Sequence, residues 1–341
     1  MNLEALKKTA QAMVAGGKGI LAADESHGTC NKRFEKLDIQ TTEEKRREYR
    51  DCLLTTPKLS DYIGGVILFD ETIRQSTLKG NVPFAKYLAD NGIVPGIKVD
   101  AGAKNMAGHP NEIITEGLDG LRERLAEYYA LGARFSKWRA VITIGANIPS
   151  TACLEANAHA LARYASLCQE ANIVPIVEPE VLIDGDHDIA RSYEVTELAQ
   201  RFLFAQLKAQ NVALEGIILK PSMVISGKSA KNRADPKTVA SETIRCLLNT
   251  TPAAVPGIAF LSGGQTDAEA AHHLSLMHNL GVSLPWHLTF SYGRALHQAA
   301  MDAWKGQATN VDAAQKVLYH RAKMNSLAAQ GKYDTSLEKA A

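Results

Sequence analysis

The sequence lacks several features that define whole classes of protein. Its 341 residues include only five cysteines, an odd number without a CxxC pair, which argues against a disulfide framework and suits a reducing cytoplasm. The 38 basic and 37 acidic residues nearly cancel, so no basic excess suggests nucleic-acid binding. No window approaches the roughly 18 apolar residues of a membrane span. We therefore expect a globular cytoplasmic protein without nucleic-acid or membrane partners.

Two ligand-binding patterns are also missing. The first predicted strand-to-helix turn has no GxGxxG fingerprint for a dinucleotide. His272, His273 and His278 lie in one helical segment but lack the HExxH spacing of a zinc site. The sequence therefore predicts no cofactor and no bound metal.

Short apolar runs alternate with helix-like segments along the chain. Such runs, bounded by Gly, Pro or charged residues, are typical of buried parallel strands. Eight of them lie at residues 19–26, 63–69, 94–100, 135–142, 174–181, 214–223, 257–264 and 286–294. Periodicity and capping residues predict the main helices at residues 2–15, 41–54, 121–130, 151–171, 189–209, 236–248, 267–280 and onward from 294 to about 329.

This alternation predicts an α/β fold. Eight parallel strands that alternate with helices close most economically into a (β/α)₈ barrel, the TIM barrel. A doubly wound open sheet is the main competitor, and the missing glycine fingerprint disfavours it. We expect a single catalytic domain over residues 1–341, with an N-terminal helix at 2–15 and a short tail after about 330.

Chemically active side chains stand at the carboxyl end of most predicted strands. In a (β/α)₈ barrel these ends converge on one mouth, where active sites are found. One charge there could simply reach solvent, whereas several acids and bases that face one another form a site. The strand ends carry Asp24, Lys98 with Asp100, Lys137 with Arg139, Glu178 with Glu180, Lys220, Ser262 and Arg294.

The predicted neighbours of Lys220 decide how this residue is interpreted. Alone, a lysine at a strand end is best explained as a solvated charge. Lys137 and Arg139 share one side of their strand, as do Glu178 and Glu180, because side chains alternate with period two. If both pairs face the barrel interior, the cations favour a neutral Lys220 amine that can form a Schiff base, and the carboxylates can serve as acid and base. Either pair alone could instead be an interior ion-pair layer.

The loops after the last two strands predict a phosphate site. Barrels commonly bind phosphate at this place. Glycines let backbone N–H groups approach the anion, a helix N-terminus adds its dipole, and an arginine can pair with phosphate oxygens in bidentate fashion. The loops here combine these features in Ser262-Gly263-Gly264 and Ser291-Tyr292-Gly293-Arg294.

A second basic cluster, Lys32 and Arg33 with Thr29, follows the first strand. From the residues alone it is best explained as the solvated start of a helix. A second phosphate pocket at this position would imply a bisphosphorylated substrate.

Seven motifs together identify a family. In order and in spacing they resemble class I fructose-1,6-bisphosphate aldolase, from about residue 17 to 333. The motifs are Leu21-Ala22-Ala23-Asp24-Glu25-Ser26, Gly96-Ile97-Lys98-Val99-Asp100, Lys137-Trp138-Arg139, Val177-Glu178-Pro179-Glu180, Leu219-Lys220-Pro221, Phe260-Leu261-Ser262-Gly263-Gly264-Gln265 and Phe290-Ser291-Tyr292-Gly293-Arg294-Ala295-Leu296.

The resemblance implies a metal-independent lyase of glycolysis and gluconeogenesis that interconverts fructose 1,6-bisphosphate with dihydroxyacetone phosphate and glyceraldehyde 3-phosphate. It assigns the Schiff base to Lys220, the main acid/base role to Glu178 and removal of the C4 hydroxyl proton to Asp24. Lys137 would support charge at the reacting centre, and Glu180 would hold the network. It also implies a homotetramer.

The resemblance further implies which residues bind the two phosphates. The C6-phosphate side would use Arg33, with Lys98 as a further cation, and Thr29 stands where several relatives have serine, which keeps the hydroxyl. Arg139 joins the substrate-binding set. The C1-phosphate would bind at Ser262, Gly263, Gly264, Ser291, Gly293 and Arg294.

The sequence departs from the family at its end. Well-known members carry a longer tail with a terminal tyrosine that assists proton exchange on the enamine, whereas Tyr333 is the last tyrosine here. We expect enamine protonation to be slower or to use another group.

Three other functions remain as alternatives: another Schiff-base barrel of the transaldolase type, a metal-dependent aldolase, and a scaffold protein on an aldolase fold. The two predicted phosphate sites argue against the first alternative. The absence of a histidine-rich ligand set argues against the second, and the complete catalytic set argues against the third.

Overall fold

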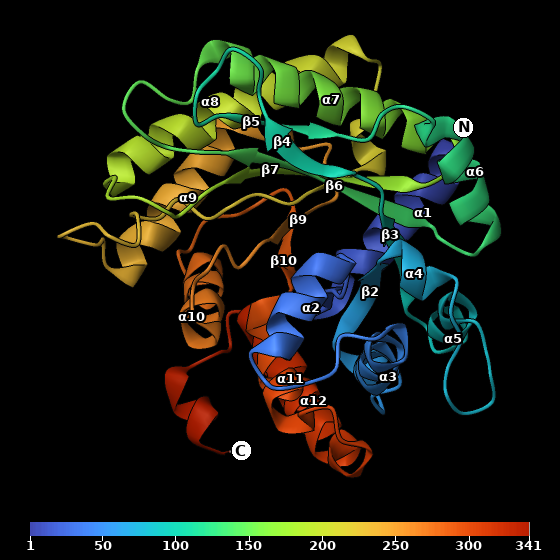
Figure 1. The fold of residues 1–341 in the computed structure, drawn as a ribbon. Helices are drawn as coiled ribbons and strands as arrows, with labels where there is room; N and C mark the ends of the chain where they lie inside the picture. Colours follow the sequence, from blue (N-terminus) through green and yellow to red (C-terminus); the bar gives the residue numbers. More distant parts are fainter. Residues whose placement is uncertain (341) are drawn as a thin grey trace.

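Eight parallel strands close into a barrel in the order β1-β10-β9-β8-β7-β6-β3-β2, which confirms the predicted (β/α)₈ fold. The computed structural model describes residues 1–340. Figure 1 shows the helices arranged around the outside of these strands. The barrel strands are β1 (Gly19–Ala22), β2 (Ile63–Leu68), β3 (Val94–Lys98), β6 (Phe135–Ile142), β7 (Val174–Val181), β8 (Ile218–Leu219), β9 (Gly257–Phe260) and β10 (His287–Tyr292).

The helices follow the predicted segments, with additional short ones. Thr42 caps α3 as expected, because its hydroxyl accepts a hydrogen bond from the Lys45 N–H at 3.2 Å. Sequence reasoning did not predict α4 and α5, which are short, and treated α2 only as a possible helix start. The helices are α1 (Leu3–Val14), α2 (His27–Glu35), α3 (Glu43–Leu54), α4 (Asp70–Ile73), α5 (Phe84–Asp90), α6 (Leu121–Ala130), α7 (Thr151–Glu170), α8 (Ile189–Ala209), α9 (Pro236–Thr250), α10 (Asp267–His278), α11 (Arg294–Trp304) and α12 (Val311–Ala328).

The predicted strand at 214–223 was too long. Leu214–Gly216 forms a 3₁₀ turn and β8 contains only Ile218–Leu219. Pro221 has no N–H to continue the ladder. Lys220 therefore follows β8 directly, and its backbone N–H still donates to the Val177 carbonyl of β7 at 2.9 Å.

An antiparallel hairpin, β4 (Gly102–Asn105) with β5 (Ile113–Glu116), lies outside the barrel. It sits beside β6 and α7 (Figure 1). No apolar pattern marks β4, because its residues are mostly exposed and include no large apolar side chain. Apolar patterning marks only strands with a buried face.

The amino ends of the barrel strands are closed by α1. Its buried residues Leu6, Ala10, Met13 and Val14 follow helical spacing and pack in one cluster with Phe135 and other strand residues. Gly64 of β2 permits this contact, because a Cβ there would lie 2.6 Å from the Met13 carbonyl oxygen. One end of the barrel is therefore filled with apolar side chains, which leaves the opposite end for a site.

No helix among residues 1–340 combines the length and the apolar character that crossing a bilayer requires.

Candidate active site

A cavity of about 780 Å³ opens at the carboxyl ends of the strands. Residues of β1, β3, β6, β7 and β10 and of the segments after β1, β8 and β9 line it, together with α2 and α11. The predicted site residues in its lining are Asp24, Thr29, Arg33, Lys98, Lys137, Arg139, Glu178, Glu180, Lys220, Ser262, Gly263, Ser291, Gly293 and Arg294.

Lys220 lies at the buried floor of this cavity and is only 4% exposed. Its Nζ lies 3.1 Å from Oε1 of Glu178, which is also buried. The second oxygen of Glu178, Oε2, has no hydrogen-bond partner among the described residues. A buried amine beside a carboxylate with a free oxygen is suited to proton transfer during attack on a carbonyl.

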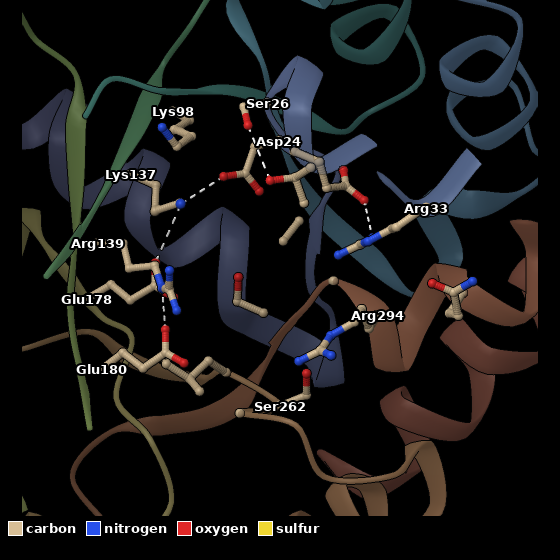
Figure 2. Close-up of a pocket in the computed structure, with 18 of the residues that line it drawn as sticks. Asp24, Ser26, Arg33, Lys98, Lys137, Arg139, Glu178, Glu180, Ser262 and Arg294 are labelled. Carbon is tan, nitrogen blue, oxygen red and sulfur yellow. Dashed lines mark hydrogen bonds and ion pairs between the residues drawn. The ribbon is translucent and has the colours of Figure 1, made fainter. Parts of the chain in front are cut away.

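Lys137 lies between two carboxylates, those of Asp24 and Glu178. Its Nζ lies 2.7 Å from Oδ2 of Asp24 and 3.7 Å from Oε2 of Glu178, and Figure 2 shows Lys137 pointing toward Asp24. Burial opposes the charge on Asp24, but Lys137 and Lys220 more than offset this and hold the pKa of Asp24 below its ordinary value. Burial likewise opposes the charge on Lys137, but Asp24 and Glu178 raise the pKa of Lys137.

Asp24 is consequently a carboxylate at neutral pH, the form that accepts a proton. The positive charge of Lys137 is balanced by these carboxylates, so its repulsion of Lys220 is smaller than the strand-end pattern alone suggests.

A second layer of ion pairs lies further out. Arg139 donates through Nε to Glu180 (Figure 2), and Glu180 is the main neighbour that raises the pKa of Arg139 against the opposing effect of burial. Lys98 Nζ lies 2.8 Å from Oδ1 of Asp100. These contacts fix the wall of the cavity next to Lys137.

At the carboxyl ends of β9 and β10, hydrogen-bond donors without partners lie close to glycine residues. The buried hydroxyl of Ser291 has no hydrogen-bond partner among the described residues. Gly293 caps α11 without a side-chain hydrogen bond, so the first N–H groups of that helix are free for an anion. Arg294 is exposed at the same rim. An anion is the ligand that suits this arrangement.

Gly263 and Gly264 have φ angles of 56° and 82°, a conformation that favours glycine. Gly263 lines the cavity, whereas Gly264 does not: a Cβ at Gly264 would lie 2.8 Å from Nζ of Lys228. Gly264 is therefore a residue of this loop that does not itself line the cavity.

The second basic cluster lies on α2, which borders the cavity. The interpretation as a solvated helix start describes Lys32, which is exposed, but not Arg33, whose side chain is 19% exposed. Arg33 Nη1 pairs with Oε1 of Glu25 at 2.5 Å, and Figure 2 shows Arg33 facing the cavity across from Lys137.

Sequence reasoning missed several lining residues. One helical face carries positions 29, 32, 33 and 36, and this spacing could have identified Lys32 and Lys36 as members of the site. The other residues have no such signal, because their position depends on how α2 and α11 pack. The missed polar residues are Glu25, Ser26, Lys32, Lys36, Gln298 and Asp302.

Within residues 1–340 no group of three or more His, Cys, Asp or Glu side chains is arranged to hold a metal ion. His273 instead bonds Oε1 of Gln265 through Nδ1 at 2.6 Å.

The chain is similar to known aldolases over almost its whole length. The family model described as glycolytic fructose-bisphosphate aldolase class-I matches residues 5–341. A probable fructose-bisphosphate aldolase class 1 of Xanthomonas campestris pv. campestris is 64% identical over 98% of this chain and 99% of its own length. Fructose-bisphosphate aldolase B of Gallus gallus is 49% identical over 98% of this chain and 92% of its own.

A solved structure agrees with these relatives. Fructose-bisphosphate aldolase from Plasmodium falciparum, in a complex with TRAP and a small molecule inhibitor, superposes with a TM-score of 0.95 at 46% identity. The match covers 97% of this chain and 96% of that one. With the fold, the cavity and these matches in agreement, the chain belongs to the class I fructose-bisphosphate aldolase family.

Proposed function

We propose that Lys220 forms the Schiff base through which this chain cleaves fructose 1,6-bisphosphate into dihydroxyacetone phosphate and glyceraldehyde 3-phosphate. The observation that carries this assignment is the buried pair of Lys220 Nζ and Glu178 Oε1, 3.1 Å apart on the floor of the cavity. A protonated imine is an electron sink, so it stabilises the carbanion that C–C cleavage leaves behind.

Glu178 serves as acid and base while the imine forms. The Lys220 amine attacks the C2 carbonyl, and Glu178 protonates the oxygen that leaves as water. Its unpartnered Oε2 supports this role, because that oxygen is free to contact the substrate. Lys137, between Asp24 and Glu178, stabilises negative charge at the reacting centre.

Asp24 accepts the C4 hydroxyl proton as the C3–C4 bond breaks. The electron pair of that bond moves into the imine and gives an enamine on Lys220, while the C4 oxygen becomes the aldehyde. Protonation of the enamine at C3 and hydrolysis of the imine then release dihydroxyacetone phosphate and restore the amine. The lowered pKa of Asp24, which Lys137 and Lys220 hold down against the effect of burial, supports its role as a base.

The two phosphates bind at opposite parts of the rim. The loops after β9 and β10, with the unpartnered Ser291 hydroxyl, take the C1-phosphate through Ser262, Gly263, Ser291, Gly293 and Arg294. Gly264 belongs to the same loop, where its positive φ suits glycine. The C6-phosphate side uses Arg33, Thr29 and Lys98, while Arg139 and Glu180 brace the wall between them.

A trapping experiment tests the central assignment. The protein is incubated with dihydroxyacetone phosphate and borohydride, which reduces an imine to a stable amine, and the modified peptide is mapped by mass spectrometry. We expect one adduct, on Lys220, and none in Lys220→Met. Omission of borohydride is the control for non-covalent binding. Labelling of Lys137, the other buried lysine of the cavity, or no labelling at all overturns the assignment.

We also propose a homotetramer in the cytoplasm. The oligomer is supported by the family resemblance, and light scattering on the purified chain tests it, with a monomer or dimer as the contrary result. The compartment is supported by five unpaired, buried cysteines and by a cytosolic isozyme of Arabidopsis thaliana among the relatives, although a chloroplastic one is also among them. Cell fractionation decides the compartment.

A further inference from the structure

Glu25 and Asp24 are neighbours in sequence but serve different networks. Asp24 faces Lys137 inside the barrel mouth. The Glu25 side chain, 7% exposed, instead contacts three cationic or potentially cationic groups on the surrounding helices. These are Arg33 Nη1 at 2.5 Å, Arg50 Nη2 at 2.9 Å and His297 Nε2 at 3.1 Å, from α2, α3 and α11.

His297 is completely buried, with a hydrogen bond at Nδ1 and a close contact without hydrogen-bond geometry at Nε2. Nε2 faces Oε1 of Glu25, and Nδ1 lies 2.8 Å from the hydroxyl of Tyr49, itself fully buried. Because a carboxylate can only accept, a proton on Nε2 is the arrangement of the ring that suits this contact. The two contacts restrict the orientation of the ring.

The Oε1 atom of Glu25 is shared between Arg33 and His297, while Oε2 faces Arg50. Burial opposes the charge on Glu25, but Arg50, His297 and Arg33 more than offset this and hold the pKa of Glu25 well below its ordinary value. The carboxylate is thus a fixed anion with a defined orientation. If His297 were lost, one of the three groups that orient Glu25 would be gone, and the carboxylate could rotate toward Arg50.

Arg33 depends on this orientation. Among the described residues, Glu25 is the only side chain with which Arg33 forms an ion pair. Arg33 commits Nη1 to Glu25 and faces the cavity (Figure 2), so the position of Oε1 decides where its remaining N–H donors point. A guanidinium binds phosphate well only when its donors are correctly directed.

We propose that His297, supported by Tyr49, is a positioning residue that fixes Glu25 and thereby directs Arg33 at the second phosphate of the substrate. This inference rests on the proposed function, which assigns Arg33 to the C6-phosphate. It makes the Glu25, His297 and Tyr49 network a determinant of the preference for a bisphosphate over fructose 1-phosphate, which has no phosphate to reach Arg33.

Steady-state kinetics with both substrates test the proposal. In His297→Leu we expect the KM for fructose 1,6-bisphosphate to rise about tenfold, because a displaced binding group loses its aligned contact with the phosphate. The kinetic constants for fructose 1-phosphate should stay within about twofold of the wild type, since that substrate does not use Arg33. His297→Gln, whose amide can still donate to Glu25, should restore most of the preference.

Two further variants protect the test against a folding defect. Tyr49→Phe removes only the hydroxyl that holds Nδ1 and should shift the KM for the bisphosphate in the same direction by a smaller factor. His278→Gln alters a half-buried histidine of α10 that bonds the Leu288 carbonyl and does not line the cavity; it should leave the ratio between the two substrates unchanged.

The result that overturns the proposal is a proportional loss on both substrates, or no loss on either, in folded His297→Leu and Tyr49→Phe. Borohydride trapping of dihydroxyacetone phosphate on each variant separates this failure from failure of the proposed function. An adduct on Lys220 with an unchanged substrate ratio contradicts only the role of His297. Absence of the adduct in the wild type contradicts the proposed function itself.

Discussion

The two ends of the barrel are built from the same strands and serve opposite purposes. At the amino ends, α1 packs Leu6, Met13 and Val14 against strand residues such as Phe135, and the space is filled. At the carboxyl ends, Lys220 and Glu178 lie on the floor of an open cavity. In a (β/α)₈ barrel, packing at one end can therefore supply stability while the other end carries charged groups that do not improve packing.

The largest expected effect on activity is that of Glu178→Gln at the cavity end. We expect kcat to fall by about 10²- to 10⁴-fold, because the amide cannot exchange the proton that imine formation requires. The free energy of unfolding should change far less in proportion, since Asp24 still pairs with Lys137. Turnover assays and urea titrations measure the two effects. Glu194→Gln, which alters a surface ion pair with Arg191, is the control.

Met13→Ala at the closed end should show the converse. Removing a fully buried side chain without refilling its space should lower the free energy of unfolding by about 2–5 kcal/mol. The kcat of the folded fraction should stay near the wild-type value, because α1 does not reach the cavity. Lys8→Ala, on the exposed face of the same helix, is the control. A large fall in kcat for Met13→Ala would contradict the proposal that the amino end serves stability and the carboxyl end serves activity.

His273 provides a pH-dependent test beside the cavity loop. Burial lowers the pKa of His273 from 6.5 to about 4, so between these values the unfolded chain binds a proton that the folded chain refuses. Its contribution to stability is complete above pH 6.5 and is lost as the pH falls toward 4, by at most about 3 kcal/mol.

In His273→Gln this part of the pH dependence should disappear, because an amide does not titrate but can still donate to Gln265. Urea unfolding at pH 7.5 and pH 5 measures, for each protein, how far the free energy of unfolding falls between the two pH values. An equal fall in both proteins would show that other groups determine the acid sensitivity of this region.

The smallest expected effect is that of Arg294→Lys at the rim. A lysine keeps the charge but not the paired N–H donors, so the KM for fructose 1,6-bisphosphate should rise about tenfold with kcat nearly unchanged. Lys228→Arg, at a cation outside the cavity lining, is the matched control. A fall in kcat without a change in KM would place Arg294 in the chemistry and not in binding.

The barrel could be predicted from sequence because buried parallel strands appear as apolar runs and strand ends converge. Lys137, Glu178 and Lys220 were identified by this rule, and the structure brings them together. The rule says nothing of structure outside the barrel. The hairpin of β4 and β5 was missed because half of it is exposed and polar.

The part of the site that lies outside the strands could not be predicted for a related reason. Glu25 meets His297 only because α2, α3 and α11 pack beside one another, and no local pattern links residues so distant in the chain. Arg33 was assigned by family resemblance, whereas its residues alone suggested a solvated helix start. The partner that orients Arg33 became visible only in the fold.

The seal that α1 forms also has a kinetic consequence. With the amino end closed, the substrate and both products must enter and leave through the same opening at the carboxyl end of the barrel. In the proposed mechanism the ketone half is still covalently bound to Lys220 after cleavage, whereas the aldehyde half is held by no covalent bond. The aldehyde must therefore depart first, and in the synthetic direction the ketone must enter before it. The covalent bond sets the order of release, and the packing of α1 sets the end of the barrel from which both products leave.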